Sequence, residues 1–235
     1  MRILALDTAT EACSAAMWID GRLLERAAEL PRGHADRILF MVEELLAESG
    51  SALASLDAVA FGRGPGSFTG VRLAASVTQG LAFGADLGVV PISDLRAVAQ
   101  GAMAGQAAAG HASGLRTLVC NDARMKEVYW ACFEPGADGL MQPVGPEHVS
   151  DPATVSLPRG WPGPVYGAGR GFASYPQLRA VLGAALEGCD ERILPWARDI
   201  AALAVPEVRA GRVVPAEQAL PVYLRDQVAQ PKFRN

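Results

Sequence analysis

The sequence predicts an α/β protein whose chain forms two similar lobes around a cleft. Its first half reads as three strands followed by helix, strand, helix, strand and helix, an order typical of helices packed on a sheet. A strand, an aspartate-bearing turn and a second strand occur twice, near Asp7 and Asp122, which indicates an internal duplication. We therefore expect an N-terminal lobe over residues 1–110 and a C-terminal lobe over residues 111–235.

Apolar runs, and the turn and cap residues between them, define the elements of the first lobe. Strands are predicted at 2–6, 13–19, 22–29, 56–61 and 88–92, with Asp20-Gly21 as a tight hairpin turn. Helices are predicted at 34–49, at 71–83 and from Ser93, as cap, to about Ala109, and Gly50 is a stop for the first. A glycine-rich loop, residues 62–70, leads from the fourth strand into the second helix.

The second lobe begins with the same pattern and then becomes less regular. Strands at 115–120 and 127–133 flank the turn Asn121-Asp122-Ala123-Arg124, and 135–139 forms another turn. Residues 140–165 are rich in Pro and Gly, which predicts irregular strands and loops. Helices are expected near 172–186 and 196–210 with a short strand at 192–194 between them, and 220–235 is expected to be an exposed tail. The helix at 196–210 is a candidate to pack back on the first lobe.

Composition limits the classes of function. The 235 residues are 50% hydrophobic and 20% charged, and no stretch approaches the roughly 20 apolar residues of a membrane span. Asp7 interrupts the apolar N-terminal run, which argues against an export signal and for a cytoplasmic protein. Because the net charge is −4 and lysines and arginines do not cluster, we expect any contact with RNA to depend on a partner.

Cysteines and histidines give no sign of a metal site. The four cysteines are widely scattered without a C-x-x-C pair, so free thiols in a reducing compartment are expected. The three histidines stand alone, without the paired spacing that a metal site requires. His34 has Ile38 four residues later, where a second histidine would complete a ligand pair on one helix face. We therefore expect His34 to cap a helix and no residue to bind a metal.

Two turns and one loop are the candidates for phosphate chemistry. Asp7-Thr8-Ala9-Thr10 resembles the first phosphate loop of the actin, sugar-kinase and Hsp70 superfamily, where an Asp-x-Gly-Thr turn wraps ATP phosphates. Here Ala9 replaces the glycine, and its methyl should obstruct close approach of a phosphate. A turn closed by Asp and Thr side-chain hydrogen bonds is therefore the favoured interpretation, both here and at Asp122. Asp7, Thr8, Thr10, Gly64 and Gly66 remain weak candidates for cofactor binding.

The loop Gly62-Arg63-Gly64-Pro65-Gly66-Ser67-Phe68-Thr69-Gly70 leads into a helix N-terminus, which suits an anion. It is not a Walker loop, because no Gly-Lys-Ser/Thr follows. Phosphate binding and a tight structural crossover are both compatible with this pattern. The loop chemistry alone leaves the choice open.

Two helices carry more apolar surface than one sheet contact requires. In the first, apolar residues from Ile38 to Leu46 cover a broad arc, while Phe40 falls on the opposite side. In the second, a bulky stripe of Leu73, Val77 and Leu81 could cover the sheet, leaving a small stripe for another helix, either of a partner or of this chain, such as the first helix or 196–210. The predicted interface residues on the two helices are His34, Ile38, Met41, Leu45, Val71, Ala75, Thr78 and Ala82.

Several longer strings identify a family resemblance. The strings are ILALDTATEACSAA, GHADRIL, GPGSFTGVR, GLAFG, DARMKEVYWA and PVYLRD, and they span nearly the whole chain. Together they resemble the TsaB family, also called YeaZ. The resemblance implies an actin-like (ribonuclease H-like) fold and a non-catalytic scaffold with no catalytic residues of its own. Its implied role is to bind and activate TsaD, the related subunit that transfers threonylcarbamoyl to the adenosine next to the anticodon in tRNAs reading codons that begin with A.

The same resemblance implies further partners. The ATPase TsaE joins the assembly, another enzyme supplies the threonylcarbamoyl-adenylate donor, and ATP or ADP is bound by partner subunits or at the complex interface. The chain alone is expected to form a homodimer and to meet tRNA only through the complex. The alternative is a small actin-fold phosphotransferase that uses ATP, with Asp7 and Asp122 as its acids. A metal-dependent peptidase is a third reading, and it lacks both a histidine pair and a serine or cysteine nucleophile with a neighbouring base.

Overall fold

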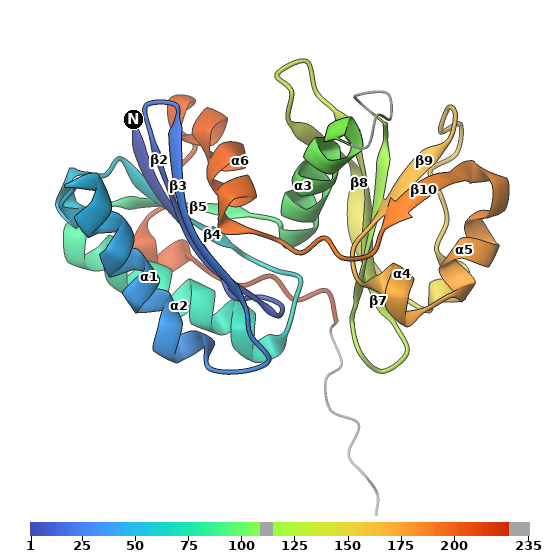
Figure 1. Ribbon diagram of the computed structural model, residues 1–235, viewed down its shortest axis with the longest axis horizontal. Coiled ribbons are helices and arrows are strands. Elements are labelled where there is room, and N and C mark those ends of the chain that lie inside the picture. The colour runs from blue at the N-terminus through green and yellow to red at the C-terminus, as the bar shows by residue number, and fades with distance from the viewer. Residues whose placement is uncertain (109–114, 226–235) are drawn as a thin grey trace, which may run out of the picture.

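The computed structural model describes residues 1–108 and 115–225 and contains two five-stranded sheets side by side (Figure 1). The first half of the chain contributes these elements: β1 Arg2–Asp7, β2 Ala12–Ile19, β3 Arg22–Glu29, α1 His34–Ser49, η1 Leu53–Ser55, β4 Ala58–Gly62, α2 Phe68–Ala85, β5 Gly88–Ile92 and α3 Asp94–Ala108. The predicted order of strands and helices in this half is confirmed. The expected lobe boundary at residue 110 lies outside the described residues.

The second half contributes a matching set of strands with shorter helices between them. Its elements are β6 Thr117–Asp122, β7 Val128–Pro135, β8 Met141–Ser150, η2 Pro152–Thr154, β9 Val165–Ala168, α4 Gly171–Ser174, α5 Gln177–Leu182, η3 Gly183–Ala185, β10 Leu186–Asp190, α6 Ala197–Arg209 and η4 Ala216–Gln218. The tail prediction for 226–235 falls outside the described residues.

Strand pairing demonstrates the duplication. The first sheet has the order β3-β2-β1-β4-β5, and the second has β8-β7-β6-β9-β10 when it is read in the same direction. In each sheet the first strand pairs antiparallel with the second strand of its lobe and parallel with the fourth. The two aspartate turns therefore join equivalent strands, and the predicted α/β fold with an internal repeat is confirmed.

The lobes exchange one helix each. Leu95, Val98 and Ala102 of α3 pack in one core with the second sheet, although α3 follows the last strand of the first. In return α6 crosses back, and its Ile200 and Leu203 pack against the first sheet. The lobes are also joined by two ion pairs, Arg63 to Glu147 at 3.0 Å and Arg170 to Glu29 at 2.6 Å.

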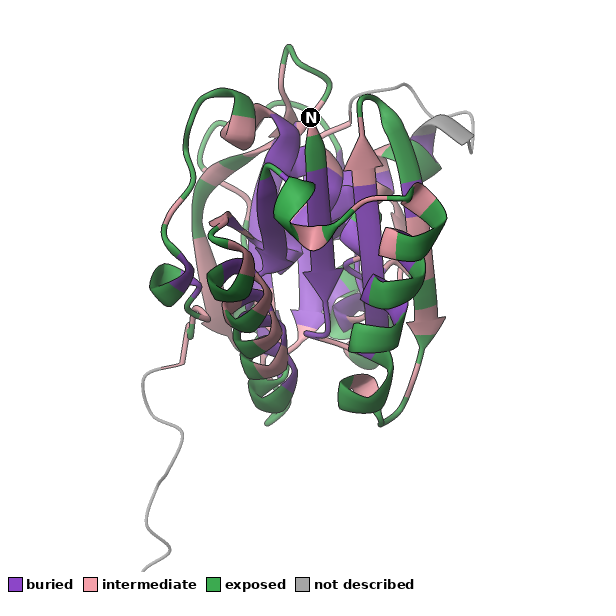
Figure 2. Ribbon diagram, turned by 90° about the vertical axis from the view of Figure 1, so that its left-hand side faces the viewer, coloured by how far each residue is buried: buried purple, intermediate pink, exposed green. Residues whose placement is uncertain are grey.

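Helices α1 and α2 cover the other face of the first sheet. Figure 2 shows the strands of this lobe largely buried beneath helices whose outer faces are exposed. The buried residues of α1 are Ile38, Met41, Val42 and Leu45, and those of α2 are Gly70, Val71, Ala74, Ala75, Thr78 and Ala82.

The predicted interface stripes are therefore wrong. Val71, Ala75, Thr78 and Ala82 on α2, and Ile38, Met41 and Leu45 on α1, lie in the core of the single chain. The strands present large side chains on this face, including Leu6, Met17 and Phe61, so small residues on α2 let the helix approach the sheet. The bulky stripe of Leu73, Val77 and Leu81 is instead only half-buried.

The irregular strands and loops predicted over residues 140–165 are confirmed. β8 lies at the edge of its sheet, where Pro143 and Pro146 are tolerated because they have no N–H to donate, and its pairing with β7 shifts register between Trp130 and Cys132. Two other local predictions in the second lobe need correction. The helix expected at 172–186 is broken into α4 and α5, which end before β10. The short strand expected at 192–194 is absent, and the strand between the helices is β10, at Leu186–Asp190. Buried Leu194 gives the crossing segment before α6 its apolar character.

Candidate functional site

Both aspartate turns are closed by their own side chains. Asp7 Oδ1 accepts a hydrogen bond from the backbone N–H of Ala9 at 2.9 Å, and Asp122 Oδ1 accepts one from the N–H of Arg124 at 2.8 Å. Thr10 Oγ1 accepts from the N–H of Ala12 at 3.1 Å. These are side-chain-closed turns of the kind that the sequence favoured, and the amides of Ala9 and Arg124 are already used.

The glycine-rich loop packs against the first turn. A Cβ added at Gly66 would lie 2.6 Å from the carbonyl oxygen of Ala9, and one at Gly70 would lie 2.0 Å from that of Thr8. The loop is fastened by a hydrogen bond from Ser67 N to Ala9 O at 2.7 Å and from Thr8 Oγ1 to Gly70 O at 2.7 Å. Close packing of two backbones therefore accounts for glycine at positions 66 and 70.

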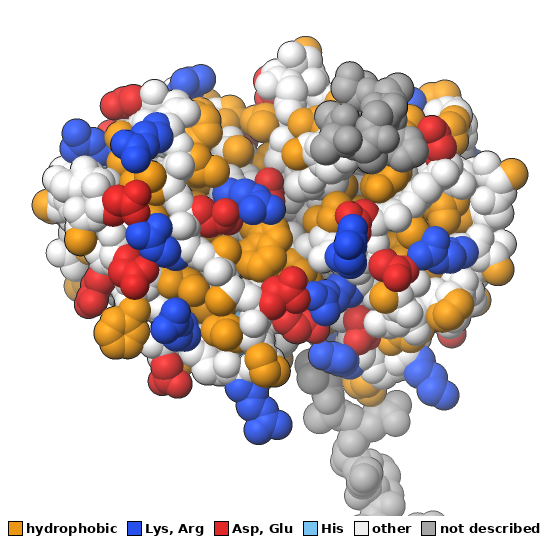
Figure 3. Space-filling view, viewed as in Figure 1, with side chains coloured by type: hydrophobic (Ala, Val, Ile, Leu, Met, Phe, Trp, Pro, Cys, Tyr) orange, Lys and Arg blue, Asp and Glu red, His pale blue; other side chains and the backbone are white. Residues whose placement is uncertain are grey.

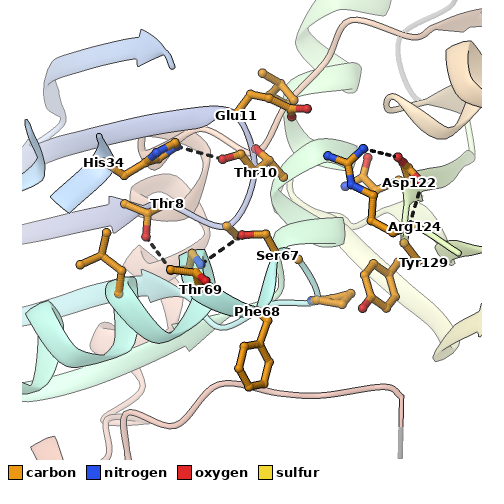
Figure 4. A pocket seen from close by; sticks show the side chains of 18 of the residues that line it. Thr8, Thr10, Glu11, His34, Ser67, Phe68, Thr69, Asp122, Arg124 and Tyr129 are labelled. Atoms are coloured by element: carbon orange, nitrogen blue, oxygen red, sulfur yellow. Dashed lines mark hydrogen bonds and ion pairs between the residues drawn. The ribbon is translucent and has the colours of Figure 1, made fainter. Parts of the chain in front are cut away.

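A cavity of about 650 Å³ lies between the lobes, beside these turns. Figure 4 shows Thr8, Thr10 and Ser67 on one side and Asp122, Arg124 and Tyr129 on the other. Of the five sequence candidates for cofactor binding, Thr8, Thr10 and Gly66 line this cavity. Asp7 and Gly64 do not line it, and both are buried.

Asp7 instead faces a second buried carboxyl that the sequence did not reveal. Asp7 and Asp94 are both fully buried, and a Cβ at Gly62 would lie within 2.7 Å of an oxygen of each. Burial raises the pKa of Asp7 to about 6. Burial, and then the charge of Asp7, raise the pKa of Asp94 well above its usual range. The raised pKa of Asp94 favours its protonated form beside Asp7, and because both carboxyls are fully buried, Asp7 has no access to a ligand in the cavity.

On the side of the second lobe, the cavity is lined by side chains that are bonded to one another. Asp122 also accepts a hydrogen bond from the Tyr175 hydroxyl at 2.8 Å and pairs with Arg124 at 3.0 Å. Burial and then this bond raise the pKa of Tyr175 to about 12. Arg225 reaches the same wall and forms an ion pair with Glu127. Both carboxylate oxygens of Asp122 are therefore bonded to groups of its own lobe.

His34 has a different role from the one predicted. The residue at the N-cap of α1 is Gly33, with φ 88°, and no side chain caps this helix. His34 Nε2 lies 3.0 Å from the carbonyl oxygen of Thr10. Since a carbonyl can only accept, Nε2 carries the proton, and His34 ties α1 to the first turn. Within residues 1–108 and 115–225 no group of three His, Cys, Asp or Glu side chains is placed to hold a metal ion.

An exposed aromatic cluster stands at the mouth of the cavity. Arg72 Cζ lies 3.6 Å from the centre of the Phe68 ring, and Arg72 Nε donates to the Tyr223 hydroxyl at 2.7 Å. The two rings lie 5.8 Å apart. Sequence reasoning missed this cluster, because 151 positions separate Arg72 from Tyr223.

Comparisons with known proteins agree with this geometry. A family model described as "TsaD: tRNA N6-adenosine threonylcarbamoyltransferase" matches residues 28–176. The chain is 42% identical to an Escherichia coli protein named "tRNA threonylcarbamoyladenosine biosynthesis protein TsaB", covering 99% of this chain and 98% of that one. A Haemophilus influenzae protein of the same name is 38% identical over 99% of this chain and 97% of its own length.

Solved structures support the same assignment. The structure of YeaZ from Pseudomonas aeruginosa superposes with a TM-score of 0.85 at 43% identity, over 95% of this chain and 99% of that chain. In the described residues no helix is long and apolar enough to cross a membrane. Fold, full-length identity and superposition lead to one conclusion: the chain belongs to the TsaB (YeaZ) family of tRNA threonylcarbamoyladenosine biosynthesis proteins.

Proposed function

We propose that this chain is a non-catalytic subunit of the machinery that makes threonylcarbamoyladenosine in tRNA, and that it acts in the cytoplasm by binding and activating TsaD. The observation that carries this proposal is unpartnered apolar surface on α1 and α2. Leu39 is 48% exposed, Phe40 61% and Phe83 83%. Large exposed apolar side chains gathered on neighbouring helices are typical of a protein–protein contact.

The exposed side of α2 also has the geometry for close helix packing. Ser76, Gly80 and Gly84 are exposed at four-residue spacing, and nothing lies within 4 Å of a Cβ added at either glycine. Leu73 and Val77 flank this line and are half-buried. The contact face is therefore proposed to be the outer side of α1 and α2, which replaces the buried stripes predicted from the sequence.

A related chain is the natural occupant of this face. The family model that matches residues 28–176 carries the TsaD description, so TsaD and this chain share a fold over that region. Two chains of similar fold can pair through equivalent helices about a near two-fold axis, as identical chains do in a homodimer. We propose that the same face forms a homodimer in isolation and the TsaD pair in the complex.

Catalysis is assigned to the partners. Asp7 is buried against Asp94, and Asp122 is bound by Arg124 and Tyr175, which weighs against the alternative of an actin-fold phosphotransferase. In this proposal TsaE supplies the ATPase, and ATP or ADP is held by partner subunits or at their interface. Figure 3 shows acidic and basic side chains interspersed over the face it displays, which favours contact with tRNA through the assembly over binding by this chain alone.

A matched pair of variants tests the contact face. Gly80→Arg places a long charged side chain on the outer side of α2, where space is open in the single chain. Gly105→Arg makes the same change at an exposed position of α3. We expect both variants to fold, and only Gly80→Arg to lose the homodimer on gel filtration and TsaD in a pull-down. Equal TsaD binding by both variants would show that the outer side of α2 is not the contact face.

A further inference from the structure

After η4 the chain crosses from the first lobe to the second as a strap, residues 219–225. At the start of the strap, Gln79 Nε2 of α2 donates a hydrogen bond to Ala219 O at 3.1 Å. Further along, Val222 N donates to Arg63 O, in the glycine-rich loop, at 2.7 Å. The strap is therefore bonded to α2 and to the loop before it leaves the first lobe.

The far end of the strap holds the turn between β6 and β7 in the second lobe. Arg225 donates to Ala123 O at 3.2 Å and forms an ion pair with Glu127, so it contacts both ends of that turn. It also donates to the sulfur of Met125, in the middle of the turn, at 3.4 Å. Only 18% of the Arg225 side chain is exposed, so these contacts are largely shielded from water.

The turn that Arg225 holds has an unfavourable backbone. Arg124, Met125 and Lys126 have φ angles of 61°, 52° and 64°, in the left-handed region, and none of them is glycine. A left-handed backbone costs free energy at each residue that carries a Cβ, so such a turn persists only where its surroundings hold it. The contacts from Arg225 are part of those surroundings.

Between its two ends, the strap meets the exposed side of α2. Arg72 Nε donates to the Tyr223 hydroxyl at 2.7 Å, and its guanidinium lies over the Phe68 ring. The rings of Phe68 and Tyr223 are both exposed. Arg72 and Phe68 precede Ser76 by four and eight residues, so they continue the exposed line of α2 that forms the proposed contact face. A partner that packs along this line also meets the strap.

We propose that the strap couples the contact face on α2 to the second lobe. In the docked arrangement, which the structure has, Tyr223 is bonded to α2 and Arg225 holds the β6–β7 turn. In the released arrangement both contacts are lost together, and the turn relaxes from its left-handed backbone. A partner that covers Phe68 and Tyr223 stabilises the docked arrangement and so tightens a turn in the other lobe. This coupling rests on the proposed function, because the partner is TsaD on the outer side of α2.

Tyr223→Phe tests the strap in the isolated chain. The substitution keeps the ring and removes the hydroxyl that accepts from Arg72, so the bond that is lost lies in the first lobe. The amides of Ala123 and Glu127 report on the turn, because both are hydrogen-bonded within it. We expect their hydrogen exchange, followed by nuclear magnetic resonance, to become several-fold faster in Tyr223→Phe, as it should in Arg225→Gln.

Arg192→Gln is the control, because it removes an ion pair with Asp190 elsewhere in the structure. Its exchange rates at the two turn amides should equal those of the wild-type chain. Wild-type rates in Tyr223→Phe would show that the strap does not transmit between its ends, and wild-type rates in Arg225→Gln would show that it does not hold the turn. Either result would overturn the proposal.

Addition of TsaD tests the direction of the coupling. In the wild-type chain, TsaD should slow exchange at Ala123 and Glu127 several-fold, whereas in Arg225→Gln it should bind and leave these rates unchanged. Unchanged rates in the wild-type complex would contradict the coupling, and slowing that persists in Arg225→Gln would show that TsaD covers the turn directly. Absence of TsaD binding would be seen separately in the pull-down and would refute the proposed function, whereas the comparison in the isolated chain is independent of it.

Discussion

Replacing Asp199 by asparagine should stabilise the protein at neutral and alkaline pH. Asp199 lies in the first turn of α6, where it is 9% exposed and its Oδ2 accepts no hydrogen bond in the described structure. Arg198 Nε is 3.8 Å away, and a Cβ at Gly101 of α3 would lie 3.2 Å from Oδ2. The carboxyl thus lies between α6 and α3, and the distant Arg198 offsets little of the cost of burying its charge. Burial raises its pKa from 3.8 to about 7.

The sign and size of the effect follow from linkage. A folded-state pKa above the unfolded value favours the protonated form, so stability falls as pH rises from 3.8 towards 7 and is then level. At 1.36 kcal/mol per pKa unit, the raised pKa lowers the free energy of unfolding, relative to its value below pH 3.8, by roughly 1.5 kcal/mol at pH 5 and about 4 kcal/mol at pH 8. Asparagine has the same shape and no charge, so the stability of Asp199→Asn relative to wild type should rise by up to about 3 kcal/mol over that range.

Urea denaturation at pH 5, 6, 7 and 8 measures this difference in unfolding free energy. Asp86→Asn is the control, because Asp86 is exposed at the end of α2 and asparagine tolerates its φ of 53°. Taking each variant relative to wild type cancels the contributions of other titrating groups. A relative stability of Asp199→Asn that stays constant from pH 5 to pH 8 would refute the reasoning.

Two further predictions concern the packing of α2. Gly70→Ala should destabilise the chain by several kcal/mol, because its Cβ would lie 2.0 Å from a backbone oxygen of the first turn, whereas Gly84→Ala, with open space around it, should stabilise the helix by about 1 kcal/mol. Thermal melts of both variants decide this, and similar melting temperatures would count against the packing described. Ala75→Arg should unfold the monomer, since Ala75 is 4% exposed in the core, whereas Ser76→Arg on the outer face should leave circular dichroism unchanged. A folded Ala75→Arg variant would show that α2 is not packed on the sheet through this stripe.

Local signals sufficed for much of the fold. Hairpin turns, helix stops and apolar runs are encoded by neighbouring residues, and the two aspartate turns could be paired because the sequence repeats them. The orientation of α2 could not be obtained this way. Its sequence shows two apolar sides. Which side packs on the sheet depends on large side chains of the strands, such as Met17 on β2 and Phe61 on β4.

The site was harder to predict than the fold. Asp94 lies beside Asp7 only because the end of β1 and the start of α3 come together in space. The sequence of neither segment predicts a pair of carboxyls. Asn121 belonged to a turn already singled out, yet its unpaired Nδ2 is visible only once its neighbours are in place. Conversely, the strand expected at 192–194 was wrong because an apolar crossing segment has the same composition as a short buried strand.

Reconstitution of the reaction tests the central claim most directly. Cognate TsaD, TsaE, tRNA and the threonylcarbamoyl-adenylate donor are combined with no further subunit, with this chain, with Gly80→Arg or with Gly105→Arg, and threonylcarbamoyladenosine is counted by mass spectrometry. We predict multiple turnover only with the wild-type chain and Gly105→Arg, and none with this chain in the absence of TsaD. Equal modification without this chain, or modification by this chain alone, would contradict the account.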